Sequence, residues 1–307
     1  MHRLPFRSLD GLLLLDKPAG LSSNAALQRV RKHFRADKAG HTGSLDPLAT
    51  GLLPICFGEA TKVAGLMLGA RKAYETEARL GVVTDTDDAD GQVLRERPVP
   101  LLDAHAVERV LKRYIGRISQ RPPIYSALKQ GGEPLYAKAR RGEIVEVAER
   151  EVDVHALEML SINGASLRLR ITCGSGTYVR SLVRDIGEDL GCGAHVVALR
   201  RLWAEPFRTP SMITLDEIEA IDRNSEPGLA ALDSLLMPVE SALTDWPRLN
   251  LSDAEVLKLG HGQSLAGLDA ANGLMAAFAP SGRAVGLVEG RDGVVHPQRL
   301  FRWAAAS

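Results

Sequence analysis

Short apolar runs and turn residues alternate near the start of the chain. The apolar run from Leu12 to Leu15 leads into Lys17-Pro18-Ala19-Gly20, and Pro and Gly end regular strand pairing. Ser22-Ser23-Asn24 can then cap a helix, because apolar residues recur at helical spacing as far as Phe34. This pattern predicts a buried strand, a turn and a helix that ends near residue 34.

Further strand and helix patterns are interspersed along the chain. Residues 73–83 and 167–173 have strand patterns, the second alternating Leu and Ile with Arg and Thr. Helices are predicted over residues 102–114 and 181–190, the second stopping at Gly191. Because there is no regular strand–helix–strand rhythm, the pattern favours an α+β fold with a mixed, mainly antiparallel sheet over a doubly wound one.

Residues 119–150 have a different character. Pro122-Pro123, Gly131-Gly132, Pro134 and Gly142 interrupt a basic stretch that has little apolar periodicity. Segments of this length without regular structure are usually functional or disordered in compact domains. We predict a long excursion from the sheet.

The pattern changes again after Asp245-Trp246-Pro247. Apolar runs at residues 274–278, 284–288 and 294–295 are separated by Ser281-Gly282 and by Gly290-Arg291-Asp292-Gly293, which are hairpin turn sequences. We predict a small all-β domain over residues 244–307, following a larger domain over residues 1–243.

Length and composition agree with two folded domains. The chain has 307 residues, of which 45% are hydrophobic and 25% charged, as is usual for globular proteins rather than disordered ones. The N-terminal apolar run is too short for a signal peptide or a membrane span, so we expect a cytoplasmic protein with no membrane association.

The net charge of zero at first argues against a nucleic-acid partner, which usually selects a basic surface. The charges are nevertheless segregated. Residues 1–72 and 112–150 carry more Lys and Arg than Asp and Glu, whereas the reverse holds for residues 73–111. Such blocks are typical either of solvated faces or of surfaces that bind phosphates.

No metal or disulfide signature is present. The three cysteines are far apart and the histidines form no HExxH pair, so we expect buried apolar thiols and no catalytic metal. Residues 84–91 superficially resemble a calcium loop, but placing Gly91 at the invariant glycine puts Arg97 where the bidentate Glu belongs. An acidic turn is the better interpretation.

The segment Gly40-His41-Thr42-Gly43-Ser44-Leu45-Asp46-Pro47 is the first candidate for chemistry. It places an imidazole, hydroxyls and a carboxylate on a backbone made adaptable by two glycines. Asp46 followed by Pro47 is also the pattern of a helix N-cap with Pro at the first helical position. Both interpretations are compatible, because a helix dipole would help to keep the carboxylate ionised.

Two later segments supply possible partners. Lys72, Tyr74 and Thr76 share one face of a predicted strand, where a Tyr either packs in the core or offers a platform for an unstacked base. Tyr178 and Arg180 point to the same side if the backbone is extended. Arg180 could form a surface ion pair with Asp185 or Glu188, or it could orient a reacting carboxylate; a phosphate-loop interpretation lacks the required glycines and lysine.

Taken together, these segments resemble the bacterial TruB family of tRNA pseudouridine synthases. The resemblance covers about two thirds of the chain and rests on five motifs in the family's order. They are Leu13 to Ser23, Gly40 to Gly51, Lys72-Ala73-Tyr74, Gly174 to Leu182 and Gly193 to Leu202.

The resemblance implies roles for individual residues. Asp46 would be the essential aspartate that acts at the ribosyl centre of uridine, Tyr74 would stack on the flipped uracil and assist the late removal of the C5 proton, and Arg180 would pair with Asp46. The remaining implied positions are Lys17 in support of the site, His41 in the space left by the flipped nucleotide, and Tyr178 and Leu199 in the pocket wall. Independently of the family, we expect Asp88 to orient Arg180 from the acidic turn.

The resemblance also implies partners. The substrate would be tRNA, with the target at uridine 55 of the T-loop, and no cofactor would be needed. Residues 119–150 would form a thumb that closes on the T-stem, and residues 244–307 a PUA-like domain. The stand-alone form implies a monomer without an obligatory protein partner. Two alternatives stay open: a guide-RNA-dependent pseudouridine synthase, and a tRNA-binding or tRNA-folding protein on the same scaffold.

Overall fold

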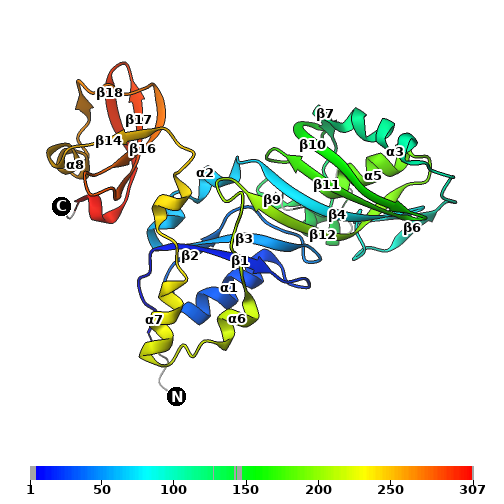
Figure 1. Cartoon of the computed structure of the whole chain (residues 1–307), viewed down its shortest axis with the longest axis horizontal. Coiled ribbons are helices and arrows are strands. Elements are labelled where there is room, and N and C mark those ends of the chain that lie inside the picture. The colour runs from blue at the N-terminus through cyan, green and yellow to red at the C-terminus, as the bar shows by residue number, and fades with distance from the viewer. Residues whose placement is uncertain (1–4, 127, 142, 144–146, 306–307) are drawn as a thin grey trace.

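The computed structural model describes residues 5–126, 128–141, 143 and 147–305. Parts of the predicted excursion, residues 127, 142 and 144–146, lie outside the described residues. Figure 1 shows an elongated molecule in which a mixed sheet with helices runs through two halves, and a separate small β-sheet packs at one end. The predicted α+β class is confirmed.

The main sheet has the order β13-β1-β3-β12-β4-β11-β10-β7, with β2 added beside β3. Only the β1–β13 and β3–β12 pairings are parallel, as expected for a mixed and mainly antiparallel sheet. Its strands are β1 (Gly11–Lys17), β2 (Ala39–His41), β3 (Thr50–Phe57), β4 (Lys72–Leu80), β7 (Gly116–Gln120), β10 (Arg150–Asn163), β11 (Ser166–Cys173), β12 (Ala194–Ala204) and β13 (Ile213–Thr214).

The pairing of β3 with β12 joins the two halves of this sheet. It consists of two residue pairs, Arg200 with Thr50 and Arg201 with Gly51. Gly51 has φ +94°, and a Cβ at this position would lie 2.2 Å from the carbonyl oxygen of Arg201. A glycine is therefore required for the two backbones to approach this closely.

Helices cover both halves of the sheet. They are α1 (Ser23–Phe34), α2 (Ala64–Leu68), α3 (Ala104–Leu111), α4 (Leu135–Arg140), α5 (Val179–Asp189), α6 (Leu215–Ala220), α7 (Glu226–Ser234) and α8 (Asp253–Gly260). None of the helices in the described part of the chain is long and apolar enough to cross a bilayer.

The apolar run of β1 is explained by burial on both strand faces. Leu13 and Leu15 pack under α1, whereas Leu12 and Leu14 face the core that leads toward the C-terminal sheet. Helix α1 has the predicted cap, with Ser22 Oγ accepting a hydrogen bond from the amide of Ala25. In the other half, α3 and α5 pack on β11 and β4.

The predicted strand over residues 73–83 is divided in two at Gly81, which has φ +86°. The acidic turn predicted for residues 84–91 is present, between β5 (Val82–Thr84) and β6 (Val93–Glu96). The chain between β7 and β10 leaves the main sheet as predicted, and its described part includes β8 (Lys129–Gln130), β9 (Glu133–Pro134) and α4.

The C-terminal sheet has the order β14-β16-β17-β18-β15. Its strands are β14 (Arg248–Asn250), β15 (Leu265–Ala266), β16 (Gly273–Phe278), β17 (Ala284–Arg291) and β18 (Val294–Leu300). The predicted hairpin turn between β17 and β18 is tight, with φ of +50° at Asp292 and +76° at Gly293. Phe278 and Phe301 also enter a core shared with β1 and β3, so this sheet is packed against the larger body.

Candidate active site

A cavity of about 530 Å³ lies where the two halves of the main sheet meet. Asp46 enters it from the loop between β2 and β3, Tyr74 from β4, and Leu199 from β12. The segment before α5 forms another wall through Tyr178. Strands and loops that are far apart in sequence thus bring these four predicted residues around one cavity.

Asp46 is not a helix cap, so this local prediction was wrong. Only a single turn follows it, in which the Ala49 amide donates to the Asp46 carbonyl (3.1 Å), and the chain then enters β3 at Thr50. Pairing of β3 with β1 and β12 imposes extended backbone and overrides the local preference for a helix. Ser23 anchors the loop, since its hydroxyl accepts from the Leu45 amide at 2.7 Å.

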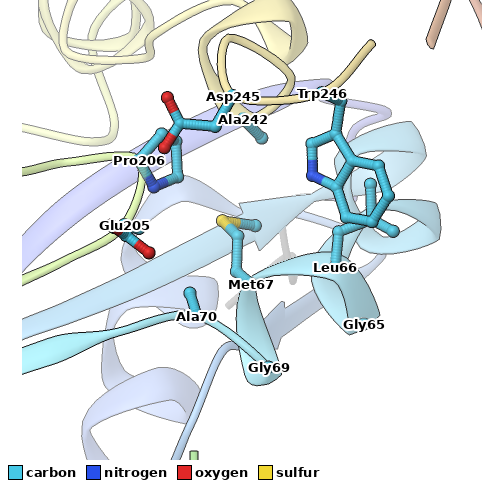
Figure 2. Close-up of a pocket in the computed structure, with 10 residues that line it drawn as sticks. All are labelled: Gly65, Leu66, Met67, Gly69, Ala70, Glu205, Pro206, Ala242, Asp245 and Trp246. Carbon is cyan, nitrogen blue, oxygen red and sulfur yellow. The ribbon is translucent and has the colours of Figure 1, made fainter. Parts of the chain in front are cut away.

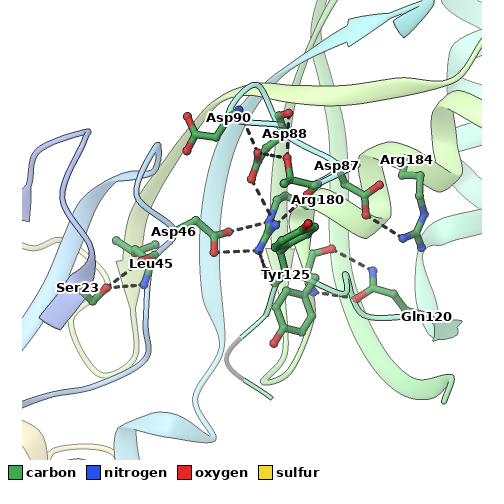
Figure 3. Close-up of polar contacts among 12 residues, drawn as sticks. Ser23, Leu45, Asp46, Asp87, Asp88, Asp90, Gln120, Tyr125, Arg180 and Arg184 are labelled. Atoms are coloured by element: carbon green, nitrogen blue, oxygen red, sulfur yellow. Dashed lines mark hydrogen bonds and ion pairs between the residues drawn. The ribbon is translucent and has the colours of Figure 1, made fainter. Parts of the chain in front are cut away.

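Arg180 faces Asp46 with two guanidinium nitrogens (Figure 3). Nη2 donates to Oδ1 at 2.9 Å, and Nε lies 2.9 Å from Oδ2. The Arg180 side chain is 3% exposed, and Nη1 lies 3.3 Å from a carboxylate oxygen of Asp88. The carbonyls of Thr86 and Tyr125 accept further bonds from the guanidinium, at 2.8 and 2.9 Å. One buried cation thus links the loop of Asp46 to the acidic turn.

The predicted start of the helix at residue 181 was wrong, and of the two alternatives left open for Arg180 the surface ion pair does not form. Arg180 is not in extended backbone, because α5 begins at Val179 rather than at residue 181. Nor does it pair with Asp185 or Glu188, which bind other arginines: Asp185 contacts Arg184, and Glu188 contacts Arg95 and Arg97. Placement in the first turn of α5 turns the guanidinium inward, toward Asp46.

The electrostatic balance at Asp46 differs from that of a capping carboxylate. Burial raises its pKa above the usual Asp value, and the negative charge of Asp88 acts in the same direction. The positive charges of Arg180 and Lys17 oppose this rise. About a third of the side chain, 32%, is still exposed to the cavity. Basic side chains rather than a helix dipole therefore favour the ionised form.

Lys17 lies beneath the same loop. Its side chain is fully buried, and Nζ donates to the carbonyls of Pro18 (2.8 Å), Leu21 (2.7 Å) and Pro47 (3.4 Å). Burial lowers the pKa of Lys17 to about 8, although the charge of Asp46 opposes the shift. Lys17 thus holds the turn after Asp46 through a backbone carbonyl.

Of the predicted substrate-binding residues, Tyr178 and Leu199 line the cavity, whereas His41, like Lys17 and Asp88, does not. It ends β2, and burial lowers its pKa, with the charge of Arg201 acting in the same direction. Its Nδ1 is buried and has no hydrogen-bond partner among the described residues. It pairs with Ile55 of β3, just before the loop that carries Asp46.

Two aromatic side chains, Tyr74 and Tyr178, line the cavity, and different contacts fix each of them. Tyr74 is 8% exposed, and burial raises the pKa of its phenol. Tyr178 is fixed through its backbone by Gln120, which accepts from its amide (2.8 Å) and donates to its carbonyl (3.1 Å). The guanidinium carbon of Arg150 lies 5.0 Å from the centre of the Tyr178 ring.

Several residues of the cavity were not predicted as site residues. The most prominent are Lys72 and Arg201, which line it and are buried. A signal for Arg201 was available in the sequence. Arg200 and Arg201 are consecutive in a strand, so one of them must face inward. Arg200 takes the outer face, where it pairs with Asp16 at 2.6 Å.

No group of three or more His, Cys, Asp or Glu side chains in the described part of the chain is arranged to hold a metal ion. A second cavity, of about 460 Å³, lies beside α2 and the start of the C-terminal domain (Figure 2). Its carboxylates Glu205 and Asp245 both pair with Arg208. The segment from Leu68 to Lys72 separates the two cavities, and none of the predicted site residues lines the second one.

Three family models match consecutive parts of the chain. Residues 31–179 match the TruB family pseudouridylate synthase N-terminal domain, and residues 180–244 match the tRNA pseudouridylate synthase B C-terminal domain. Residues 246–302 match the C-terminal domain of tRNA pseudouridine synthase II.

Curated relatives match nearly the whole chain. A tRNA pseudouridine synthase B from Xanthomonas campestris pv. campestris (strain B100) is 59% identical over 300 residues, 97% of this chain and 96% of the relative. One from Pseudomonas fluorescens (strain Pf0-1) is 50% identical over 298 residues, 96% of this chain and 97% of the relative.

Solved structures share the fold over nearly the whole chain. The structure titled "Crystal Structure of a Cbf5-Nop10-Gar1 Complex" has a TM-score of 0.74 and 26% identity, over 96% of this chain and 86% of that chain. A second, of an H/ACA RNP bound to a substrate RNA containing 2′-deoxyuridine, has a TM-score of 0.72 and the same identity and coverage.

Proposed function

Because the chain belongs to the TruB family of pseudouridylate synthases and is therefore a tRNA pseudouridine synthase, we propose that it acts on uridine 55 of the T-loop. The observation that carries the proposal is the pairing of Asp46 with Arg180 at a cavity that also contains Tyr74. A carboxylate held in this way, beside an aromatic wall, suits attack on the ribose of a base that has left its stack.

In the proposed reaction the bond between N1 of uracil and C1′ of ribose breaks with the help of Asp46. The detached base turns within the cavity and rejoins C1′ through C5, after which C5 loses its proton and N1 gains one. The product is an isomer of the substrate, so we expect no redox cofactor and no second substrate. Arg180 keeps the Asp46 oxygens directed at the cavity throughout.

Base flipping requires that the cost of extrusion be offset. Removing a base from a folded loop costs a few kcal/mol, and stacking on an aromatic side chain returns about 1–3 kcal/mol. Tyr74 is the proposed platform, with Tyr178 and Leu199 as the surrounding walls. Lys17 supports the loop of Asp46 from below, and His41 is proposed to occupy the place that the flipped nucleotide leaves.

The remainder of the tRNA would be held outside the cavity. We assign the excursion within residues 119–150 to the T-stem, because it leaves the sheet at β7 and β10, close to Tyr178, and is basic in sequence. Phosphate contacts of this kind fix position without reading sequence. We propose that the enzyme acts as a monomer in the cytoplasm without an obligatory protein partner, and that residues 244–307 form a PUA-like domain.

The test is release of tritium from C5 of uridine in an unmodified tRNA transcript. We expect the purified chain alone to release one tritium per transcript, and none when position 55 is changed to cytidine. Release only after addition of a guide RNA and partner proteins would favour the guide-dependent alternative. Binding and refolding of tRNA without any release would favour the tRNA-folding alternative.

The raised pKa of Asp46 predicts the acid side of the pH profile. As pH falls through this pKa, the carboxylate takes up a proton and loses its charge, so kcat/KM should fall at a pH above the range of an ordinary Asp, about 3.9. Asp88→Asn should move this fall to lower pH, because the charge of Asp88 raises the pKa of Asp46. The measurement is kcat/KM against pH, with recovery of activity at neutral pH as the control for unfolding. A shift to higher pH in Asp88→Asn would contradict the assignment.

A further inference from the structure

Arg201 is a buried cation next to Tyr74. It is 1% exposed and lies on β12 directly opposite Tyr74 of β4, in an antiparallel pairing that puts both side chains on the same face of the sheet. Both residues line the cavity that contains Asp46. The guanidinium is therefore inside the site rather than on the outer face, where Arg200 lies.

The contacts of Arg201 fix it in place but do not neutralise it. Nε donates to the carbonyl of Leu52 at 2.6 Å, and Nη2 donates to the carbonyl of Gly43 at 3.0 Å. Among the described residues, no carboxylate lies within 4.0 Å of its nitrogens. Burying an unpaired charge is costly, and two carbonyl contacts could be made by a neutral donor. A purely structural role therefore leaves the charge unexplained.

Two glycines lie next to Arg201, one against its side chain and one against its backbone. A Cβ added at Gly43 would lie 3.5 Å from Nη1 of Arg201, and one added at Gly51 would collide with the Arg201 backbone. Both glycines have positive φ, at +71° and +94°. Arg201 thus connects the loop that carries Asp46 to the strand that carries Tyr74.

The positive charge acts on the titratable groups around it. Burial raises the pKa of Tyr74, and the charge and hydrogen bonding of Arg201 oppose that rise. Burial lowers the pKa of Lys72 to about 8, and the charge of Arg201 acts in the same direction. Of these groups, Tyr74 is the one whose ionised form the cation favours.

We propose that Arg201 is a positioning residue for Tyr74, holding its phenol oxygen and favouring negative charge on it while the C5 proton is removed. The inference rests on the proposed function. After C5 has joined C1′, the C5–H bond breaks and the proton passes to the Tyr74 oxygen, which has given its own proton to solvent. The electron pair forms the C5=C6 bond, the former N1=C6 pair moves to N1, and N1 takes a proton from solvent.

The experiment compares two substrates in single-turnover reactions. One tRNA transcript carries uridine with deuterium or tritium at C5, and the other carries 5-fluorouridine at position 55, which has no C5 proton to lose. Arg201→Gln should slow tritium release about tenfold or more, because it weakens proton removal. It should show a larger deuterium isotope effect than wild type, and it should rearrange 5-fluorouridine at the wild-type rate. Arg201→Lys, which keeps the charge, should recover part of the loss.

Equal slowing on both substrates, without a change in isotope effect, would overturn the inference, since a structural role affects every step. If Arg201→Gln does not fold, Arg201→Lys is measured with and without Tyr74→Phe. An effect that disappears in the Tyr74→Phe background supports the inference, and one that persists overturns it. Absence of tritium release from wild type would instead overturn the proposed function, so the two failures are distinguishable.

Discussion

Asp46→Asn is expected to lower the rate of tritium release about 10⁴-fold, which corresponds to about 5.4 kcal/mol of barrier. Asn has nearly the same shape but cannot act as a nucleophile or carry the negative charge that faces Arg180. The single-turnover rate with labelled tRNA transcript measures the loss. Binding of tRNA should change little, because the proposed phosphate contacts lie outside the cavity.

The matched control is Asp37→Asn, which changes an exposed carboxylate in the same half of the sheet. It should release tritium at the wild-type rate. Equal rates for wild type and Asp46→Asn would remove Asp46 as the reacting group, whereas loss of tRNA binding in Asp46→Asn would indicate that the loop had not kept its structure.

Arg180→Met is expected to reduce both stability and activity. It leaves Asp88, which is 4% exposed, without its cationic partner, and removing one member of a buried ion pair typically costs about 3–5 kcal/mol of unfolding free energy. The rate should fall about 10²- to 10³-fold, because Asp46 loses the group that orients it. Denaturant unfolding and single-turnover tritium release measure the two effects.

Two further variants accompany Arg180→Met: one is a control on the same helix, and the other removes an anchor of Arg180. Arg184→Met changes the next arginine along α5, which pairs with Asp87 and Asp185 away from the cavity, and should leave the rate near wild type. Asp88→Asn keeps Arg180 but removes one of its anchors, and should lower turnover about tenfold. Unchanged turnover in Asp88→Asn would show that Asp88 does not orient Arg180.

Local patterns predicted those parts of the fold that depend on neighbours in sequence. The cap at Ser22, the helix to Phe34 and the tight turn at Asp292-Gly293 are all confirmed, because capping and turn conformation are set within a few residues. The apolar run from Leu12 to Leu15 was also correctly interpreted as a buried strand.

The errors arose where distant segments decide the conformation. Asp46-Pro47 has the local pattern of a helix start. The chain nevertheless enters β3, because β3 pairs with β1 and with β12, which lies about 150 residues later in the sequence. Likewise, the inward orientation of Arg180 depends on the first turn of α5 and on Asp88, neither of which follows from the spacing around it.

The site itself was predicted mainly through family resemblance. Sequence spacing alone did not place Asp46 next to Arg180, or Tyr74 and Leu199 around one cavity, because these residues come from elements that are far apart in the sequence. Arg201 and the carbonyl of Tyr125 were missed for the same reason. A consecutive pair of arginines in a strand indicates that one faces inward, but it does not identify the neighbour that it meets.

The two-pair joint between β3 and β12 means that neither half of the main sheet holds a complete site. Asp46 precedes β3 in one half, whereas its partner Arg180 on α5 and the aromatic walls Tyr74 and Tyr178 belong to the other. Turnover therefore reports whether the halves have docked in the correct register. In a chain divided between them, restored activity would serve as an assay of reassembly.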